Sequence, residues 1–354
     1  MKKHHSRMLG TGLVLLSIIL PIIVAELGLR LFLSLRQKPS FYRDDPVTGW
    51  APMESVSYSG KLTSLSGRSY NASYSTNNIG LRELSSQLNN SPFRQRQHTI
   101  LAIGDSFTGD FFSSNDDAWF GRIQQNLSVP VYAYGMGGSG TYQQYLAFRR
   151  LYPIVKPSIL IIQFCTNDIS NDSLKHSYYS IVFSQDLRRP YNISGKSYFR
   201  NDLIAKLYRA LYSSSKLFKR LDSRVQGVLY KINNGYSMVH GYKLNAIEAS
   251  AIATWKNNYR QYVEYARSVG VKSIWSVSCA SALEPSSKRY VDIWRQESEE
   301  LGVIPLQSFA DSFYKASLNG EDVFYSDGGH LNDYGNKLAG DALSREITNK
   351  SLLK

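Results

Sequence analysis

Four short polar clusters in this sequence supply the side-chain types that acyl transfer needs: a serine, several glycines, an asparagine and an acid–histidine pair. They read GDS at 104–106, GMGGSGT at 135–141, TND at 166–168 and SDGGH at 326–330. A serine hydroxyl becomes a useful nucleophile when a neighbouring base takes its proton and a third group fixes the tautomer of that base. The clusters therefore predict a serine nucleophile that works with a histidine base.

Ser106 is the predicted nucleophile, His330 the predicted base and Asp327 the acid that orients the imidazole. Asp327 precedes His330 by three residues, a spacing that puts both side chains on the same side of one turn. No other histidine follows an acid at this spacing. The others lie near the N-terminus, before a strand or in a long insertion, as His4, His5, His98, His176 and His240.

Attack on an ester carbonyl creates an oxyanion, which requires preorganised hydrogen-bond donors. The predicted donors are the backbone N–H of Ser106, the N–H of a glycine in GMGGSGT and the side-chain amide of Asn167. Metal-dependent phosphoester chemistry is the alternative use of these polar residues. No known two-metal spacing is found among its possible ligands, which are Asp105, Asn167, Asp168 and His330.

The polar clusters follow predicted strands or begin a predicted helix. From His98 onward, short Val/Ile/Leu runs alternate with helical patterns, as is typical of parallel strands joined by crossover helices. The predicted strands are 99–103, 131–134, 159–164, 271–277 and 303–306, and the predicted helices include 118–127, 142–152, 251–270 and 289–302. The pattern predicts a doubly wound α/β sheet, in which ligands bind beyond the carboxyl ends of the strands.

Each cluster alone is explained by a turn or a helix cap, but their conjunction, in this order, favours a catalytic site. The sequence resembles the SGNH, or GDSL-type, hydrolase family in GDSF at 104–107, GMGGSG at 135–140, CTND at 165–168 and DGGHLN at 327–332. The resemblance covers about 98–347 and is weakest in the insertion. TNNIGLRE at 76–83 and the apolar N-terminal segment resemble membrane-anchored bacterial members of that family.

The resemblance implies a flavodoxin-like three-layer α/β/α sandwich with a parallel sheet of about five strands. It also implies ester hydrolysis through an acyl-enzyme, with no metal and no organic cofactor. Carried over to this sequence, it assigns the nucleophile to Ser106 and completes the oxyanion hole with Asn167 and Gly138. Gly135 and Gly137 remain alternatives for the glycine.

The N-terminal segment predicts export. Residues 8–25 are uncharged and apolar and follow Lys2, Lys3 and Arg7, so we expect an uncleaved signal anchor that crosses the membrane as a helix. We expect the tip in the cytoplasm and the bulk at the periplasmic or extracellular face of a bacterial inner membrane. The predicted organisation is an anchor at 1–38, a lead-in segment at 39–97 and a catalytic domain at 98–354.

The catalytic domain contains a predicted basic, partly helical insertion at about 169–245. Thirteen Lys or Arg residues lie between Lys175 and Lys243 against three Asp, while the whole chain carries a net charge of +13. The segment 203–221 predicts a basic amphipathic helix, for which a solvated surface helix is the preferred interpretation over a membrane or anionic-substrate contact. A nucleic-acid partner is not expected, because the basic segment follows a secretion signal and carries no recognised binding motif.

The two cysteines, Cys165 and Cys279, each end an apolar strand-like run. At such positions a thiol usually behaves as a small buried hydrophobe, so two free, buried cysteines are favoured, with a single bridge between them as the open alternative. Cys165 stands two residues before Asn167, where the resembling family usually has glycine. This departure bears on the size of the substrate.

The leading hypothesis is a serine esterase that deacylates a small molecule or a glycan, such as an O-acetylated cell-envelope polysaccharide. An O-acyltransferase would use the same residues, with a sugar hydroxyl replacing water in the second step. A non-catalytic binding or assembly protein with the same fold is a third hypothesis. The sequence does not specify the oligomeric state.

Overall fold

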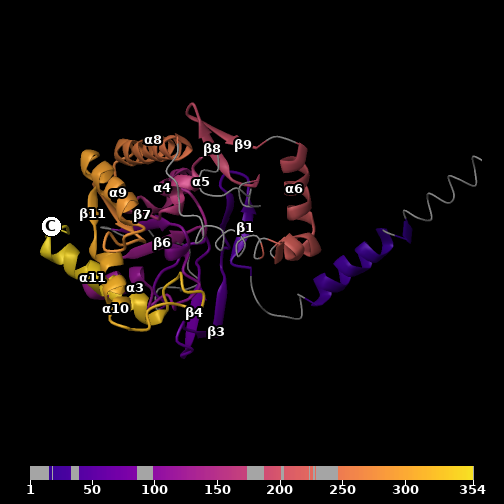
Figure 1. Ribbon diagram of the computed structural model, residues 1–354, viewed down its shortest axis with the longest axis horizontal. Helices are drawn as coiled ribbons and strands as arrows, with labels where there is room; N and C mark the ends of the chain where they lie inside the picture. The colour runs from indigo at the N-terminus through magenta and orange to yellow at the C-terminus, as the bar shows by residue number, and fades with distance from the viewer. Residues whose placement is uncertain are drawn as a thin grey trace, which may run out of the picture. The chain divides into compact units, whose positions relative to one another are not determined.

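The computed structural model describes residues 16–17, 19–32, 40–85, 99–173, 187–200, 203–222, 224–225, 228 and 246–353 (Figure 1). The chain divides into two compact units. One unit combines Met1–Pro39 with Arg200–Gly241, and the other combines Ser40–Phe199 with Tyr242–Lys354. The second unit contains every predicted site residue.

A five-stranded parallel sheet forms the centre of the larger unit. Its strands are β5 (Ile100–Gly104), β6 (Val131–Gly135), β7 (Ile159–Phe164), β10 (Ser273–Ser278) and β11 (Ile304–Leu306). Their order across the sheet is β11-β10-β7-β5-β6, which is the flavodoxin-like order. β5, β6 and β7 are buried along their whole length, as expected for uninterrupted apolar strands covered on both faces.

Helices cover both faces of this sheet, which makes the predicted three-layer sandwich (Figure 1). One face packs against α4 (Thr141–Val155), α8 (Ala246–Ser268) and α9 (Lys288–Glu300). The other face packs against α3 (Trp119–Leu127), α10 (Ser308–Leu318) and α11 (Asp333–Asn349). The predicted α/β fold, its five strands and the predicted helices that correspond to α3, α4, α8 and α9 are confirmed.

The lead-in segment forms two antiparallel hairpins that the sequence analysis did not identify. β1 (Tyr42–Asp45) pairs with β2 (Gly49–Pro52), and β3 (Ser57–Thr63) pairs with β4 (Ser69–Ser75). Along β4, Tyr70, Ala72 and Tyr74 are buried while the intervening Ser and Asn side chains are exposed. These strands belong to the same compact unit as the central sheet.

The insertion is only partly described. In the larger unit it contributes the antiparallel hairpin β8 (Pro190–Ile193) and β9 (Lys196–Phe199). In the smaller unit it contributes α6 (Leu203–Ser214), a break at Ser215 and helical residues 216–222, so the predicted helix 203–221 is interrupted. Residues 174–186 and 229–245 of the insertion lie outside the described residues.

The predicted membrane span at 8–25 falls partly outside the described residues, because 8–15 and 18 are not among them. Residues 16–17 and 19–32 are helical. Over the part of the chain that the structure describes, no helix has both the length and the apolar character needed to span a membrane.

The two cysteines are paired, which is the alternative that the sequence analysis favoured less. Cys165 and Cys279 form a disulfide, with a Cα–Cα distance of 5.1 Å. The physical reason is the strand order: Cys165 directly follows β7, Cys279 directly follows β10, and these strands are hydrogen-bonded neighbours in parallel register. Residues that are 114 positions apart in the sequence therefore meet at the same edge of the sheet.

Candidate active site

Ser106 lies where β5 ends and begins the short helix α2 (Ser106–Gly109). The Asp105 carboxylate caps this helix by accepting the Phe107 N–H at 3.1 Å, and it also accepts the N–H of Ser106. The end of β6 lies against α2 so closely that a Cβ on Gly135 would be 1.8 Å from the Gly109 nitrogen. Gly135 is therefore needed for this close packing, which fixes the position of the Ser106 turn.

Asp327 and His330 form the pair that their spacing predicts. Asp327 Oδ2 lies 2.6 Å from His330 Nδ1, while Oδ1 accepts the backbone N–H groups of Gly329 and His330 at 2.9 and 3.0 Å. Both side chains are partly exposed. The Asp327 carboxylate thus holds the loop and fixes the tautomer of the imidazole. His330 Nε2 is left as the nitrogen available for proton transfer.

The electrostatics of this pair favour charge on both members. Burial opposes the ionised form of Asp327, but the His330 hydrogen bonds outweigh it and lower the pKa of Asp327 to about 2. Burial likewise opposes the charged imidazole, yet the Asp327 hydrogen bond and the negative charges of Asp327, Asp105 and Asp110 raise the pKa of His330. A base with a raised pKa accepts a proton more readily once it is neutral.

Aromatic rings surround His330 and connect it to the Ser106 helix. The Phe107 ring lies 5.5 Å from the imidazole and the Phe112 ring lies 4.8 Å from it, measured between centroids. Phe112 also stacks on Tyr325 at 4.3 Å. Since Phe107 directly follows Ser106, the ring contact places His330 beside the helix that begins at Ser106, although the two residues are more than two hundred positions apart in the sequence.

The glycine turn after β6 contains the predicted oxyanion glycine. The Gly137 N–H donates to the hydroxyl of Tyr42 at 2.6 Å. Gly138 has a φ of +69°, a left-handed conformation that glycine adopts without strain, and its N–H has no hydrogen-bond partner among the described residues. Of Gly135, Gly137 and Gly138, only Gly138 combines a positive φ with an N–H that has no hydrogen-bond partner among the described residues.

Asn167 lies at the end of β7, where α5 (Asn167–Asn171) begins. Its side-chain nitrogen is 3.4 Å from Asp105 Oδ2, so the predicted amide donor and the Ser106 helix cap share one carboxylate. Cys165 Sγ lies 3.5 Å from the other oxygen of Asp105. A sulfur of the disulfide and the Asn167 amide therefore contact the same carboxylate.

Asp168, next to Asn167, is a buried acid of a different kind. Its Oδ2 lies within 3.2 to 3.4 Å of the Thr141 hydroxyl, the Gln144 amide and the Cys165 N–H. Burial, reinforced by the nearby Asp105, raises the pKa of Asp168 well above its usual value. Burial thus disfavours the charged form of Asp168, whose side chain is fully enclosed beside Asn167.

The lead-in segment contributes contacts that sequence reasoning missed. The Tyr42 hydroxyl accepts from Gly137, and the Trp50 indole donates to the Gly137 carbonyl at 3.2 Å. The Tyr70 hydroxyl donates to the Phe112 carbonyl at 2.8 Å. Hairpin β1–β2 thus holds the glycine turn, and hairpin β3–β4 holds the loop of Phe112, whose ring lies against His330. The alternation of Tyr with Ser and Asn in β4 is the sequence signal that could have identified part of this support.

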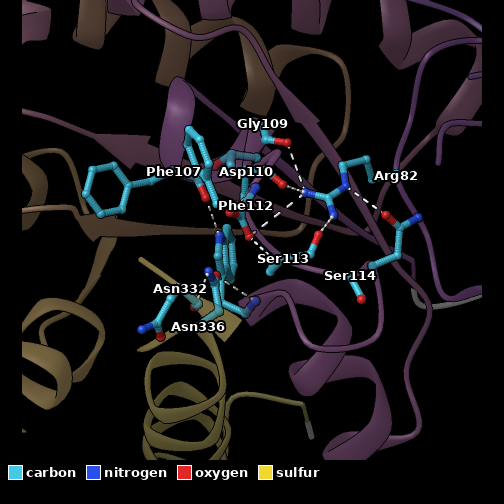
Figure 2. Close-up of polar contacts among 12 residues, drawn as sticks. Arg82, Phe107, Gly109, Asp110, Phe112, Ser113, Ser114, Asn332 and Asn336 are labelled. Atoms are coloured by element: carbon cyan, nitrogen blue, oxygen red, sulfur yellow. Dashed lines mark hydrogen bonds and ion pairs between the residues drawn. The ribbon is translucent and has the colours of Figure 1, made fainter. Parts of the chain in front are cut away.

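Arg82 is the most completely buried cation near the site, with 1% of its surface exposed (Figure 2). Its guanidinium donates to the carbonyls of Gly109, Asp110 and Ser113 and to the Asn115 side chain. It also stacks over the rings of Tyr74 and Phe120. The loop that follows the Ser106 helix is thereby folded around one arginine from the lead-in segment.

The loop carrying His330 is fastened to α11 and α3 by two asparagines (Figure 2). Asn332 caps α11 by accepting the Gly335 N–H at 2.9 Å and donates to the Asp322 carbonyl at 2.7 Å. Asn336 accepts the N–H of Trp119, whose indole donates to the Phe107 carbonyl at 3.0 Å. These bonds connect the predicted base and the residue after the predicted nucleophile through buried side chains.

Comparison with protein families identifies the region that carries the serine, the glycines and the asparagine. Residues 100–192 match the model of the GDSL-like lipase/acylhydrolase family. The chain contains a GDSL-like lipase/acylhydrolase domain. The match begins at β5 and ends within β8. Asp327 and His330 therefore lie outside the matched residues. No curated protein matches the chain.

Several solved structures resemble the chain at low identity. A psychrotrophic esterase from Pseudoalteromonas sp. is 11% identical over 72% of this chain and 100% of its own, with a TM-score of 0.41. A putative lipolytic protein of the G-D-S-L family from Desulfitobacterium hafniense is 16% identical over 70% and 99%, with a TM-score of 0.40. An acetylxylan esterase from Geobacillus stearothermophilus is 12% identical over 72% and 95%, with a TM-score of 0.38.

Metal-ligating side chains do not gather at this site. Across the described ranges, no group of three or more His, Cys, Asp and Glu residues is arranged to hold a metal ion. The polar groups that do converge are a serine, an acid–histidine pair, an asparagine amide and a free glycine N–H. Their chemistry is proton transfer and anion stabilisation.

Proposed function

We propose that this protein hydrolyses an acyl ester through an acyl-enzyme on Ser106. The observation that carries the proposal is the 2.6 Å contact between Asp327 Oδ2 and His330 Nδ1, which leaves His330 Nε2 for a proton from serine. The matched GDSL-like lipase/acylhydrolase model supports ester hydrolysis in general. The predicted roles of Ser106, Asp327, His330, Gly138 and Asn167 remain part of this proposal.

In the first step, Ser106 Oγ attacks the ester carbonyl as its proton moves to His330 Nε2. The tetrahedral oxyanion accepts hydrogen bonds from the Gly138 N–H, the Asn167 amide and the Ser106 N–H. Collapse breaks the bond to the alcohol, which takes the proton from His330 and departs. A water then gives a proton to His330 and attacks the acyl-enzyme. Collapse of the second tetrahedral intermediate breaks the bond to Ser106 Oγ, which takes the proton back from His330 as the acid leaves.

The proposed substrate is an O-acyl ester on a cell-envelope glycan or a small acylated molecule. The Cys165–Cys279 disulfide supports an oxidising compartment outside the cytoplasm, where structural disulfides persist. The half-exposed side chains of Ser106 and His330 are suited to an ester carried on a larger molecule. We also propose that the apolar segment 8–25 inserts in the bacterial inner membrane and keeps the catalytic domain on its outer face.

Hydrolysis of a small aryl acetate by the full chain in detergent tests this function, with Ser106→Ala as the matched variant. We expect acetate release by the parent and a loss of at least about 10³-fold in the variant. Adding an O-deacetylated glycan distinguishes hydrolysis from transfer. A transferase would acetylate the glycan, and the amount of free acetate released would fall. Folded protein that neither releases nor transfers acetate would favour the non-catalytic alternative.

A further inference from the structure

The helices of the smaller unit expose an apolar stripe that no described part of the chain covers. The stripe comprises Leu203, Ile204, Leu207 and Leu211 on α6, followed by Leu221, Val225 and Val228. Each of these side chains is between 47% and 72% exposed. The spacings of four and three residues place them along one side of each helical piece. Contiguous exposed apolar surface of this kind marks a binding surface rather than a solvated helix.

The opposite side of α6 already has partners within the unit. Ala205 is fully buried, and Tyr208 packs against Tyr212 at 5.6 Å and against Phe218 at 5.4 Å. The packed side therefore differs from the apolar stripe. Since the internal side of the unit is occupied, the stripe is left for a partner outside the unit.

Basic residues flank the apolar stripe. Lys206, Lys216, Arg220 and Arg224 are exposed, and from Leu203 to Val228 the only acidic residue in the sequence is Asp222. Lys and Arg extend their charged ends toward anionic headgroups while their methylene chains cover apolar surface. An apolar stripe edged by Lys and Arg is the pattern of a helix that lies in the interface of an anionic membrane.

A set of hydrogen bonds connects this surface to the apolar N-terminal helix. The Glu26 carboxylate accepts the N–H groups of Lys216 and Leu217 and the hydroxyl of Ser215, each at 2.8 Å. Arg30 is paired with Glu26 and donates to the Ser214 carbonyl at 2.7 Å. The bend between α6 and residues 216–222 is therefore fixed to the first charged residue after the apolar run 8–25.

We propose that the apolar stripe of α6, continued by Leu221, Val225 and Val228, lies in the headgroup region of an anionic lipid bilayer. If residues 8–25 insert, Glu26 lies where the hydrocarbon ends, and its bonds place the bend at the same depth. The inference rests on the proposed insertion of the N-terminal segment and is independent of ester hydrolysis. It replaces the solvated surface helix favoured by the sequence analysis.

A single reactive thiol tests the proposal in the full chain, because both native cysteines are paired in the disulfide. An environment-sensitive fluorophore is attached at Leu207→Cys, and the matched control is Ser213→Cys, at an exposed position away from the stripe on the same helix. Each protein is reconstituted into phosphatidylcholine vesicles with and without phosphatidylglycerol. Leu211→Cys repeats the measurement on the stripe.

With phosphatidylglycerol, we expect the probes at 207 and 211 to shift to the blue and to be quenched by spin-labelled lipid. The probe at 213 is expected to remain open to aqueous iodide. The combined variant Lys206→Gln, Lys216→Gln, Arg220→Gln should lose most of the lipid quenching. Iodide quenching at 207 and 211 in both vesicle types would overturn the proposal, as would protection from both quenchers, which would indicate a protein partner. Acetate release is not read, so failure here is distinct from failure of the esterase proposal.

Discussion

The Asp327 carboxylate lies 2.6 Å from Nδ1 of His330 and holds the loop of that histidine through two further backbone bonds. The pKa of His330 is raised although burial acts against its charged form, because the Asp327 hydrogen bond and the surrounding carboxylates prevail. A general base must be neutral to accept the serine proton. This relationship links the pH dependence of the reaction to one contact.

We therefore expect kcat/KM to fall as pH decreases through the raised pKa of His330, with the inflection above the ordinary histidine value of about 6.5. Asp327→Asn removes the charge that raises this pKa, so its inflection should move to lower pH. Loss of the correct tautomer should also lower the plateau by about 10²- to 10⁴-fold. The measurement is kcat/KM for an aryl acetate across pH. An unchanged inflection in the variant would contradict the assigned pair.

Tyr42 provides a prediction for the glycine turn. Tyr42→Phe removes the hydroxyl that accepts the Gly137 N–H, so the turn carrying Gly138 loses one fixed contact. Loss of a neutral hydrogen bond of about 0.5–1.5 kcal/mol corresponds to a decrease of roughly 2- to 10-fold in kcat/KM. The control is Tyr58→Phe, whose hydroxyl makes no hydrogen bond within the described residues. Equal effects of both variants would show that the Tyr42 contact does not matter for turnover.

Arg82 is expected to stabilise the fold far more than a surface arginine. Arg82→Lys removes the planar fork that serves three carbonyls and an asparagine, and leaves those groups unsatisfied in the core. We expect the free energy of unfolding to fall by about 3 kcal/mol or more. Arg68→Lys alters an exposed ion pair with Asp333 and should cost less than about 1 kcal/mol. Urea unfolding in detergent compares the two, and similar losses would refute the assignment.

Asp168 provides a prediction for the pH dependence of stability. Burial raises the pKa of Asp168, so its charged form is disfavoured in the folded state and Asp168→Asn should change the free energy of unfolding by about 1 kcal/mol or less. A raised pKa in the folded state means that stability is present at low pH and is lost as pH rises through that pKa. The Asn variant should therefore gain on the parent toward alkaline pH. A gain toward acidic pH would show that Asp168 is ionised in the folded protein.

The central sheet could be predicted because its strands are uninterrupted apolar runs. The predicted 159–164 coincides with β7, and the predicted 131–134 differs from β6 by one residue. The aspartate–histidine pair could also be predicted, since a spacing of three residues acts within one turn. Patterns within a few consecutive residues were therefore sufficient to predict the strands and the aspartate–histidine pair.

The parts that the sequence did not reveal depend on contacts between distant segments. Pairing of Cys165 with Cys279 requires the strand order, which places β7 beside β10. Burial of Arg82 requires a pocket of carbonyls from a loop almost thirty residues further on, whereas an isolated arginine is expected at the surface. The hairpin β3–β4 is rich in Ser and Tyr, and β1 consists of Tyr, Arg and two Asp, so these strands lack the apolar character by which the others were identified.

Covalent labelling of the full chain by a fluorophosphonate tests most directly whether Ser106 is the nucleophile. Mass spectrometry of the digested protein locates the labelled residue. The account predicts one adduct, on Ser106, with no adduct in folded Ser106→Ala and much slower labelling in folded His330→Ala. Labelling elsewhere in the parent, or equal labelling of the His330 variant, would contradict the proposed nucleophile and base. A folded parent that resists the probe and leaves aryl acetates intact would contradict the esterase itself.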